Sequence, residues 1–251
     1  LKRRTRPPSR RDRRLVRVFC FPLDGASKFV SRKAKVIQQA ADVPAPTMTE
    51  SRYSMSFTAG ALLHQESLTV AKLFEELGDW EAVRERVMDD NLLRMRTPSA
   101  SKRIFWEVTG RLKHLTPAQL ALLRTGTRQE QGHLLWLAIC KRYRFIYDFA
   151  VEVVREKFIR LDFDLSYDAY DVFFNNKAEW HPEVEGVAES TRKKLRQVLF
   201  KMMREANLLT QDNQILPAMP TPREIEVITA DSPSYLLAFP VSPTEIQEWL
   251  S

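Results

Sequence analysis

The amino-acid sequence predicts a mainly α-helical protein with two helix-turn-helix-like or winged-helix-like units and a small β-hairpin. Three observations support this fold class. Apolar residues recur at helical spacing from residue 56 onward, helix-capping residues stand at the expected boundaries, and glycine is scarce, at 7 of 251 residues. Scarce glycine argues against a turn-rich all-β fold and against a glycine-rich phosphate loop. The hydrophobic fraction of 44% suffices for a substantial core.

The first 47 residues differ from the rest in composition. They hold 13 Lys and Arg against 3 Asp, whereas residues 48–251 carry 26 Lys and Arg against 29 Asp and Glu. We interpret residues 1–47 as a disordered basic extension, and one explanation is translation upstream of a natural start at Met48 or Met55. A basic arm that lies along nucleic-acid phosphates is one alternative, and a transit peptide, which the composition supports only weakly, is another. The high isoelectric point therefore does not show by itself that the body binds nucleic acid.

Residues 55–128 are expected to form an N-terminal helix-turn-helix-like domain. Its first helix ends at Gly78, and Asp79 is the expected N-cap of the second. Thr116, with Gln119 three residues later, predicts a capping box at the start of the fourth helix. The third predicted helix, ASKRIFWEVTGRLKHL, has two candidate caps, Ser99 and Ser101.

Residues 129–251 are expected to form a C-terminal winged-helix-like domain. It begins with one long helix, QEQGHLLWLAICKRYRFIYDFAVEVVREKF, whose apolar stretch is too short to span a bilayer. Ser166 is the expected start of the next helix, and TRKKLRQVLFKMMREANLL is strongly amphipathic. Short apolar strands around Asp212-Asn213 predict a hairpin, the wing. Two C-terminal helices each begin at a proline.

Charge is segregated along the body. Residues 84–128 and 190–204 each carry a net charge of +6, whereas residues 145–189 carry −7. On a helical wheel, both basic segments bury one apolar face and present cations on the other. Trp106 and Phe200 project from these polar faces, so we expect them to meet another domain, a partner or bases.

Two exposed basic helices of this kind strengthen the case for nucleic-acid binding more than a single one would, and merely solvated Lys and Arg faces are the alternative. Ser190 or Thr191 is the expected cap of the second basic helix, whose free N–H groups would favour a phosphate. The hairpin after it would reach the DNA backbone or the minor groove. The candidate DNA-binding residues are Lys102, Arg103, Lys113, Thr191, Arg192, Lys193, Lys194, Arg196, Gln197, Lys201 and Asn213.

Other chemistry finds less support in the sequence. Cys20 and Cys140 have neither metal-ligand nor disulfide spacing, which favours a reducing cytoplasm. No serine stands in a nucleophile-elbow sequence. A carboxylate group near His181 suits helix starts better than a metal site; its members are Asp162, Asp164, Asp168 and Asp171. We therefore expect a protein without catalytic activity, metal or cofactor.

Four segments together resemble the BrxA family of bacterial BREX phage-defence systems: SFTAGALLHQESLTVAKLF, SASKRIFWEVTGRLKHL, HLLWLAICKRYRFIYDFAVEVVREKF and ESTRKKLRQVLFKMMREANLL. The resemblance covers residues 55–251 and rests on order and spacing, because no single motif is diagnostic. It implies a cytoplasmic, helical protein that binds double-stranded DNA beside a methyltransferase, a phosphatase-fold protein and an ATPase. The matching basic positions are Lys102, Arg103, Arg192, Lys193, Lys194 and Arg196.

A scaffold that docks other BREX components is the alternative function. In that case the basic faces would meet acidic protein surfaces, and Trp106 and Phe200 would be hot spots of the interface.

Overall fold

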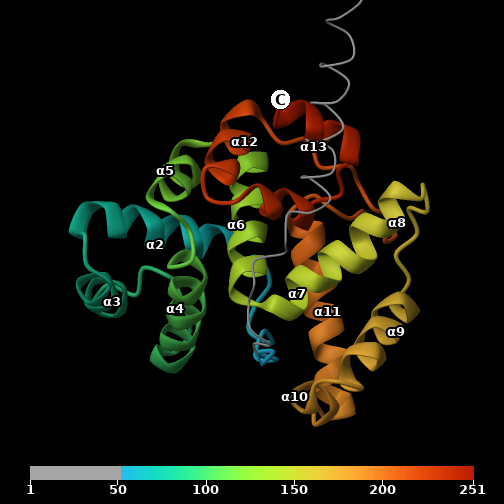
Figure 1. The fold of residues 1–251 in the computed structure, drawn as a ribbon. Helices are drawn as coiled ribbons and strands as arrows, with labels where there is room; N and C mark the ends of the chain where they lie inside the picture. The colour runs from blue at the N-terminus through green and yellow to red at the C-terminus, as the bar shows by residue number, and fades with distance from the viewer. Residues whose placement is uncertain (1–51) are drawn as a thin grey trace, which may run out of the picture. The chain divides into compact units, whose positions relative to one another are not determined.

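The computed structural model describes residues 52–251, so the interpretation of residues 1–47 lies outside the described part of the chain. The predicted mainly helical fold is confirmed for the part that is described (Figure 1). Its elements, in chain order, are α2 (His64–Leu77), α3 (Trp80–Asp89), α4 (Pro98–Leu112), α5 (Pro117–Thr125), α6 (Arg128–Arg142), α7 (Arg144–Phe149), the π-helix η1 (Ala150–Arg155), α8 (Glu156–Ile159), α9 (Tyr167–Ala178), α10 (Pro182–Glu185), α11 (Glu189–Glu205), α12 (Pro222–Thr229), the 3₁₀ helix η2 (Pro233–Ala238) and α13 (Pro243–Trp249).

Most predicted helix boundaries are confirmed. Gly78 ends α2 in the left-handed conformation, and the Asp79 side chain accepts hydrogen bonds from the first turn of α3. Thr116 and Gln119 form the expected capping box of α5, and Ser166 caps α9. These short-range signals succeed because both partners of each cap lie within three residues of each other.

The caps predicted for the two basic helices are wrong. Helix α4 begins earlier, at Pro98, and Thr97 is its N-cap, so Ser99 lies in the first turn and Ser101 is buried. Helix α11 begins at Glu189 after Ala188, which offers no side-chain cap. Ser190 and Thr191 therefore lie inside the first turn of α11 and do not cap it.

The long helix predicted from residue 129 is broken at Tyr143. This residue leaves the helical region, with φ −116° and ψ 93°, and its ring is buried while its hydroxyl donates to Glu107 of α4. The buried contact with α4 fixes the direction of the side chain and separates α6 from α7. The chain then continues through η1, a π-helix. Such local packing across helices leaves no periodic signal in the sequence.

The predicted hairpin after α11 is present as a turn, but only isolated bridges form. Leu209 is bridged to Ile215, the Thr210 N–H donates to the Gln214 carbonyl at 2.9 Å, and Asn213 adopts the left-handed conformation at the turn. A third extended segment, which the sequence did not reveal, joins it where the Ile215 N–H donates to the Phe163 carbonyl at 2.7 Å. The winged-helix assignment remains a prediction.

Helix α6 lies at the centre of the fold, with α4 and α5 on one side and α7 and α11 on the other (Figure 1). Its residues from Gly132 to Cys140 are all buried, and Leu134 to Cys140 belong to one hydrophobic cluster that also includes Tyr53 and Ile246. The backbone at Gly132 lies beside Ala206 at the end of α11, where a Cβ would stand 3.5 Å from the Ala206 Cα, in ordinary van der Waals contact. The domain boundary at residues 128 and 129 remains a prediction.

Buried polar groups fix the start of α6 against α12. His133 and Glu224 are both buried, and His133 Nδ1 lies 2.8 Å from a Glu224 carboxylate oxygen, so each buried polar group has a partner. The Glu130 carboxylate accepts hydrogen bonds from Thr221 and Arg223.

Within residues 52–251, no helix combines the length and the apolar character needed to cross a membrane.

Candidate nucleic-acid interface

Helix α4, the loop before it and its C-cap carry a group of exposed residues that we call the α4 face; it consists of Arg94, Arg96, Lys102, Arg103, Trp106 and Lys113. Within residues 52–251, none of its five cations forms an ion pair. Helix α4 has no acidic residue in its first turn, so the positive end of the helix dipole is not offset there. The Lys113 Nζ lies 5.6 Å from the centre of the Trp80 ring. The α4 face is therefore a positive surface with its cations available.

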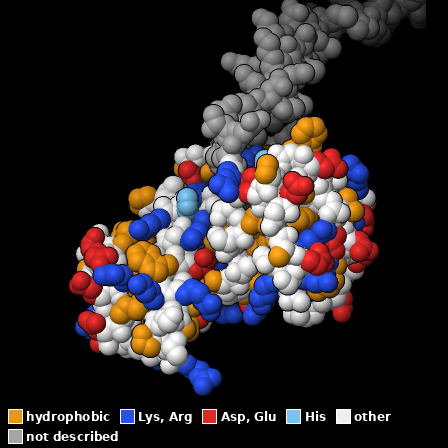
Figure 2. Space-filling view, turned by 90° about the horizontal axis from the view of Figure 1, so that it is seen from below, with side chains coloured by type: hydrophobic (Ala, Val, Ile, Leu, Met, Phe, Trp, Pro, Cys, Tyr) orange, Lys and Arg blue, Asp and Glu red, His pale blue; other side chains and the backbone are white. Residues whose placement is uncertain are grey.

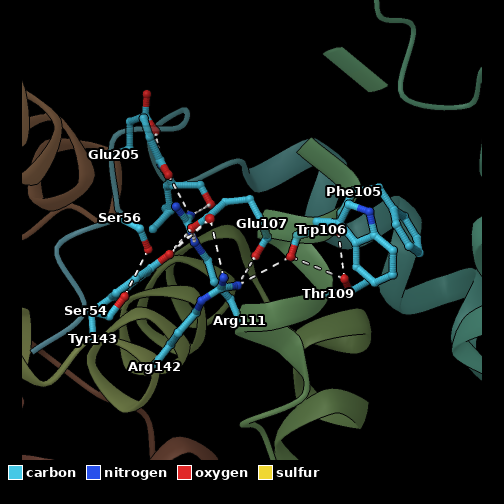
Figure 3. A network of polar contacts seen from close by, with 12 residues as sticks. Ser54, Ser56, Phe105, Trp106, Glu107, Thr109, Arg111, Arg142, Tyr143 and Glu205 are labelled. Carbon is cyan, nitrogen blue, oxygen red and sulfur yellow. Dashed lines mark hydrogen bonds and ion pairs between the residues drawn. The ribbon is translucent and has the colours of Figure 1, made fainter. Parts of the chain in front are cut away.

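The opposite side of α4 is held by a buried polar network (Figure 3). The Arg111 side chain is 1% exposed, and its Nε donates to Glu107 at 2.8 Å. Burial lowers the pKa of Arg111, and the Glu107 carboxylate opposes that effect. Tyr143 and Arg142 also donate to Glu107. This network sets the rotation of α4 and so turns its cations outward.

The same network connects α4 to α11 through the backbone of two adjacent residues, Ala61 and Leu62. The Arg111 guanidinium donates to the Leu62 carbonyl at 3.3 Å and to the Ala61 carbonyl at 2.7 Å. The Leu62 N–H donates to Glu205 of α11 at 2.8 Å. The two basic helices are thus bound to one short loop and keep a fixed spacing.

The cations of α11 are mostly engaged within the protein. Arg192 donates to Asp171 of α9 at 3.1 Å, and Arg196 pairs with the same carboxylate. Lys193 pairs with Glu189 at 3.3 Å, and Lys201 with Glu205 at 3.7 Å. Asp171 belongs to the acidic segment 145–189, so that segment covers part of the predicted DNA-binding surface.

The other predicted DNA-binding residues of α11 and of the hairpin after it are partly exposed to solvent. Lys194 and Gln197 are exposed, and within residues 52–251 Lys194 has no ion-pair partner. Thr191 is half-buried. The Asn213 side-chain oxygen accepts a hydrogen bond from Arg204 at 2.5 Å, which ties the hairpin turn to α11. We call Thr191, Arg192, Lys193, Lys194, Arg196, Gln197 and Lys201 the α11 face.

Acidic side chains surround the start of α11. Glu179, Glu185 and Glu189 are exposed in the chain that leads into it, and Trp180 between them is 81% exposed. Phosphates would be repelled at this end of the helix. The structure therefore gives the α4 face and the α11 face different electrostatic surroundings, although both segments carry the same net charge in the sequence.

Trp106 and Phe200, the two aromatic residues expected to project from the polar helix faces, differ in how far they are buried. Phe200 is fully buried, and its ring centre lies 4.9 Å from that of Tyr167 on α9. It therefore meets another element of the same chain. Trp106 is 46% exposed and contacts Phe105 edge-on at 5.7 Å.

Two residues of the α4 face, Arg94 and Arg96, were not predicted from the sequence as site residues. They lie in a loop before α4, outside the helical pattern, and the sequence indicated them only through their contribution to the net charge of residues 84–128.

Figure 2 shows one face of the molecule, seen from below relative to Figure 1, and the charged side chains on it. Lys and Arg side chains form a band across its lower part, with hydrophobic side chains between them, and Asp and Glu gather toward the two ends. Such a mixture of cations and apolar groups suits a ligand with both phosphates and flat apolar surfaces.

The carboxylates and the cysteine considered for catalysis are either paired with other side chains of the protein or buried. In the described residues, no cluster of three or more His, Cys, Asp or Glu side chains could hold a metal ion. Asp162 pairs with Lys157, Asp164 accepts from Gln214, and Asp171 pairs with the α11 arginines. Burial raises the pKa of the Cys140 thiol, which disfavours the reactive thiolate.

Comparison with known proteins supplies the family. The BrxA family model matches residues 51–232. The chain is 26% identical over 147 residues to the BREX protein BrxA of Escherichia coli O9:H4 (strain HS), covering 59% of this chain and 69% of that one. It is 27% identical over 160 residues to the BREX protein BrxA of Bacillus cereus (strain H3081.97), covering 64% and 80%.

A solved structure has the same fold. The crystal structure of an uncharacterized protein from Magnetospirillum magneticum superposes with a TM-score of 0.65 at 21% identity, covering 75% of this chain and 98% of that one. Because the family model spans most of the described residues, from the segment before α2 to α12, the chain belongs to the BrxA family.

Proposed function

We propose that this protein is a non-catalytic, double-stranded-DNA-binding component of a BREX phage-defence system. Membership of the BrxA family supports its place in such a system and implies other BREX components as partners. The resemblance further suggests a cytoplasmic protein that acts beside a methyltransferase, a phosphatase-fold protein and an ATPase.

One observation carries the DNA-binding proposal: the α4 face has five exposed cations without ion pairs in the described residues. Lysine and arginine that are free of acids can replace the counterions of DNA phosphates, and the released counterions drive binding. The α11 face adds Lys193, Lys194 and Lys201 at its rim, whereas Arg192 and Arg196 are held by Asp171. We therefore assign the main phosphate contacts to α4 and its preceding loop.

A salt series tests this proposal. Affinity of the full chain for a fluorescent 30-base-pair duplex is measured by anisotropy between 50 and 200 mM salt. About four phosphate contacts predict a slope of about −3 to −4 for log affinity against log salt, or a loss of roughly 100-fold over this range. A flat salt dependence or the absence of duplex binding would contradict the proposal. Residues 52–251 are measured alongside, to separate the body from the basic N-terminal segment.

A scaffold that docks other BREX components is the second candidate, and Trp180 favours it. This ring is 81% exposed beside Glu179 and Glu185, a place that suits a basic protein segment better than DNA. Capture of purified BREX components that survives nuclease treatment and is lost in Trp180→Ala would support it. If duplex binding were absent as well, the scaffold would replace the DNA-binding proposal.

A further inference from the structure

Trp106 is an exposed aromatic ring in the middle of a cationic surface. It is 46% exposed on α4, and Lys102 and Arg103 precede it by four and three residues, which places all three on one side of the helix. In the described residues neither cation has an ion-pair partner. Part of the indole ring stays exposed to solvent in the folded protein, so its apolar surface is available to a ligand.

The backbone beneath Trp106 is held rigidly. Its carbonyl oxygen accepts from the Thr109 hydroxyl at 3.4 Å and from the Arg142 guanidinium at 3.5 Å, and its ring packs edge-on against buried Phe105. Figure 3 shows the ring on the side of α4 away from Glu107 and Arg111. A fixed ring of this kind loses little conformational freedom when a ligand binds.

Cations also flank Trp106 toward the end of α4. Exposed Lys113 follows the ring by seven residues, two turns further along the chain, and has no ion pair within residues 52–251. Lys102 and Arg103 thus lie before the ring and Lys113 after it. A helix rises about 1.5 Å per residue, so Lys102 stands about 6 Å along the axis from Trp106. This spacing suits the separation between a phosphate and a neighbouring base of one strand.

We infer that Trp106 stacks on an unpaired or unstacked DNA base, and that it gives the protein a preference for distorted duplexes. The inference rests on the proposed DNA-binding function and names the form of DNA that this surface selects. A nucleic-acid strand offers a flat apolar face and negative charge together, and aromatic residues among cations are the usual means of binding it. An apolar protein surface would instead leave Lys102 and Arg103 without a counter-charge.

The test compares three substrates of equal length and sequence: an intact duplex, the same duplex with a two-nucleotide bulge, and the single strand. The full chain is compared with Trp106→Ala, Trp106→Phe and the exposed-tryptophan control Trp180→Ala. We expect Trp106→Ala to weaken binding of the bulged duplex about ten-fold and of the intact duplex at most two-fold. Trp106→Phe recovers most of the affinity, and Trp180→Ala changes neither.

A second readout is tryptophan fluorescence. Stacking on a base quenches the Trp106 emission, so the bulged duplex should quench wild type more than Trp106→Phe. Equal losses on intact and bulged duplexes, or no loss on either, would overturn the inference. Absence of wild-type binding to every substrate would overturn the proposed function as well. Thermal melting checks each variant for folding, and if Trp106→Ala is destabilised the Trp106→Phe quenching decides.

Discussion

Helices α4 and α11 both present lysines and arginines opposite an apolar face, but acids from other elements reach α11 and leave α4 open. Asp171 of α9 holds Arg192 and Arg196, and exposed Glu179 and Glu185 stand near the start of α11. In the described residues, no acid pairs with the exposed cations of the α4 face. Local net charge along the chain is the same for both segments, +6. What distinguishes them is the charge that the fold brings alongside.

The difference shows why segment charge is an incomplete guide to a binding surface. Coulomb interactions depend on distance in space, and a carboxylate within 4 Å of a guanidinium largely cancels its attraction for a phosphate. The pairing partner of α11 lies about twenty residues earlier in the chain, on a helix that packs across it. Affinity for a polyanion should therefore be concentrated on α4 and its preceding loop.

The largest effect is expected from the buried pair that joins the two regions. Arg111→Ala removes the closest charged partner of the buried Glu107 carboxylate and the donor to Leu62, and it leaves Glu107 with the Tyr143 hydroxyl and a longer, 3.7 Å, contact with Arg142. Loss of one member of a buried pair costs about 3–5 kcal/mol of unfolding free energy. Urea denaturation measures it, with exposed Arg103→Ala as control, which should change stability by less than about 0.5 kcal/mol. Equal stability of the two variants would show that the network does not hold α4.

Two sets of substitutions, one on each face, test the comparison between α4 and α11. Changing Arg94, Arg96, Lys102 and Arg103 to Ala removes four unpaired cations and should lower duplex affinity about 100-fold and flatten the salt slope by about 3. Changing the three exposed lysines of α11, Lys193, Lys194 and Lys201, to Ala should lower affinity about three-fold. Anisotropy at 100 mM salt measures both. A larger loss in the α11 set would reverse the assignment of the two faces.

A pH experiment separates stability from DNA binding. Burial alone would raise the pKa of Glu130, but hydrogen bonds from Thr221, Thr127 and Arg223 outweigh it and lower the pKa to about 2. A lowered folded-state pKa stabilises the protein above the ordinary carboxyl value, and this stability is lost as the pH falls from about 4.5 toward 2.

Glu130→Gln should therefore lower the unfolding free energy at pH 7 by about 1–3 kcal/mol and flatten its decline between pH 5 and pH 2. Urea denaturation at several pH values measures the change. Because Glu130 lies at the start of α6, outside both basic faces, duplex affinity at pH 7 should stay unchanged. An unaltered acid transition in the variant would assign acid unfolding to other carboxylates.

The sequence alone was sufficient for the features that depend on neighbours within one turn. The helical class and the capping boxes followed from spacing of three or four residues. Contacts between distant segments were not predictable: the break at Tyr143, the burial of Phe200 under Tyr167 and the capture of two arginines by Asp171. Each depends on how helices cross, which periodicity within one helix does not encode.

Asp171→Asn offers the smallest and most discriminating change. It would remove the negative charge that pairs with Arg192 and Arg196, while Arg192 keeps its hydrogen bonds to Asn175 and to the backbone carbonyl of residue 171, so both positive charges become available to phosphates. If the α11 face lies along bound DNA, duplex affinity should rise about three-fold and the salt slope should steepen by about 1. Asp168→Asn is the matched control, since it removes the same charge from α9 without releasing an arginine. Equal gains in both variants would mean that only net charge matters, and no gain in either would place α11 away from the DNA.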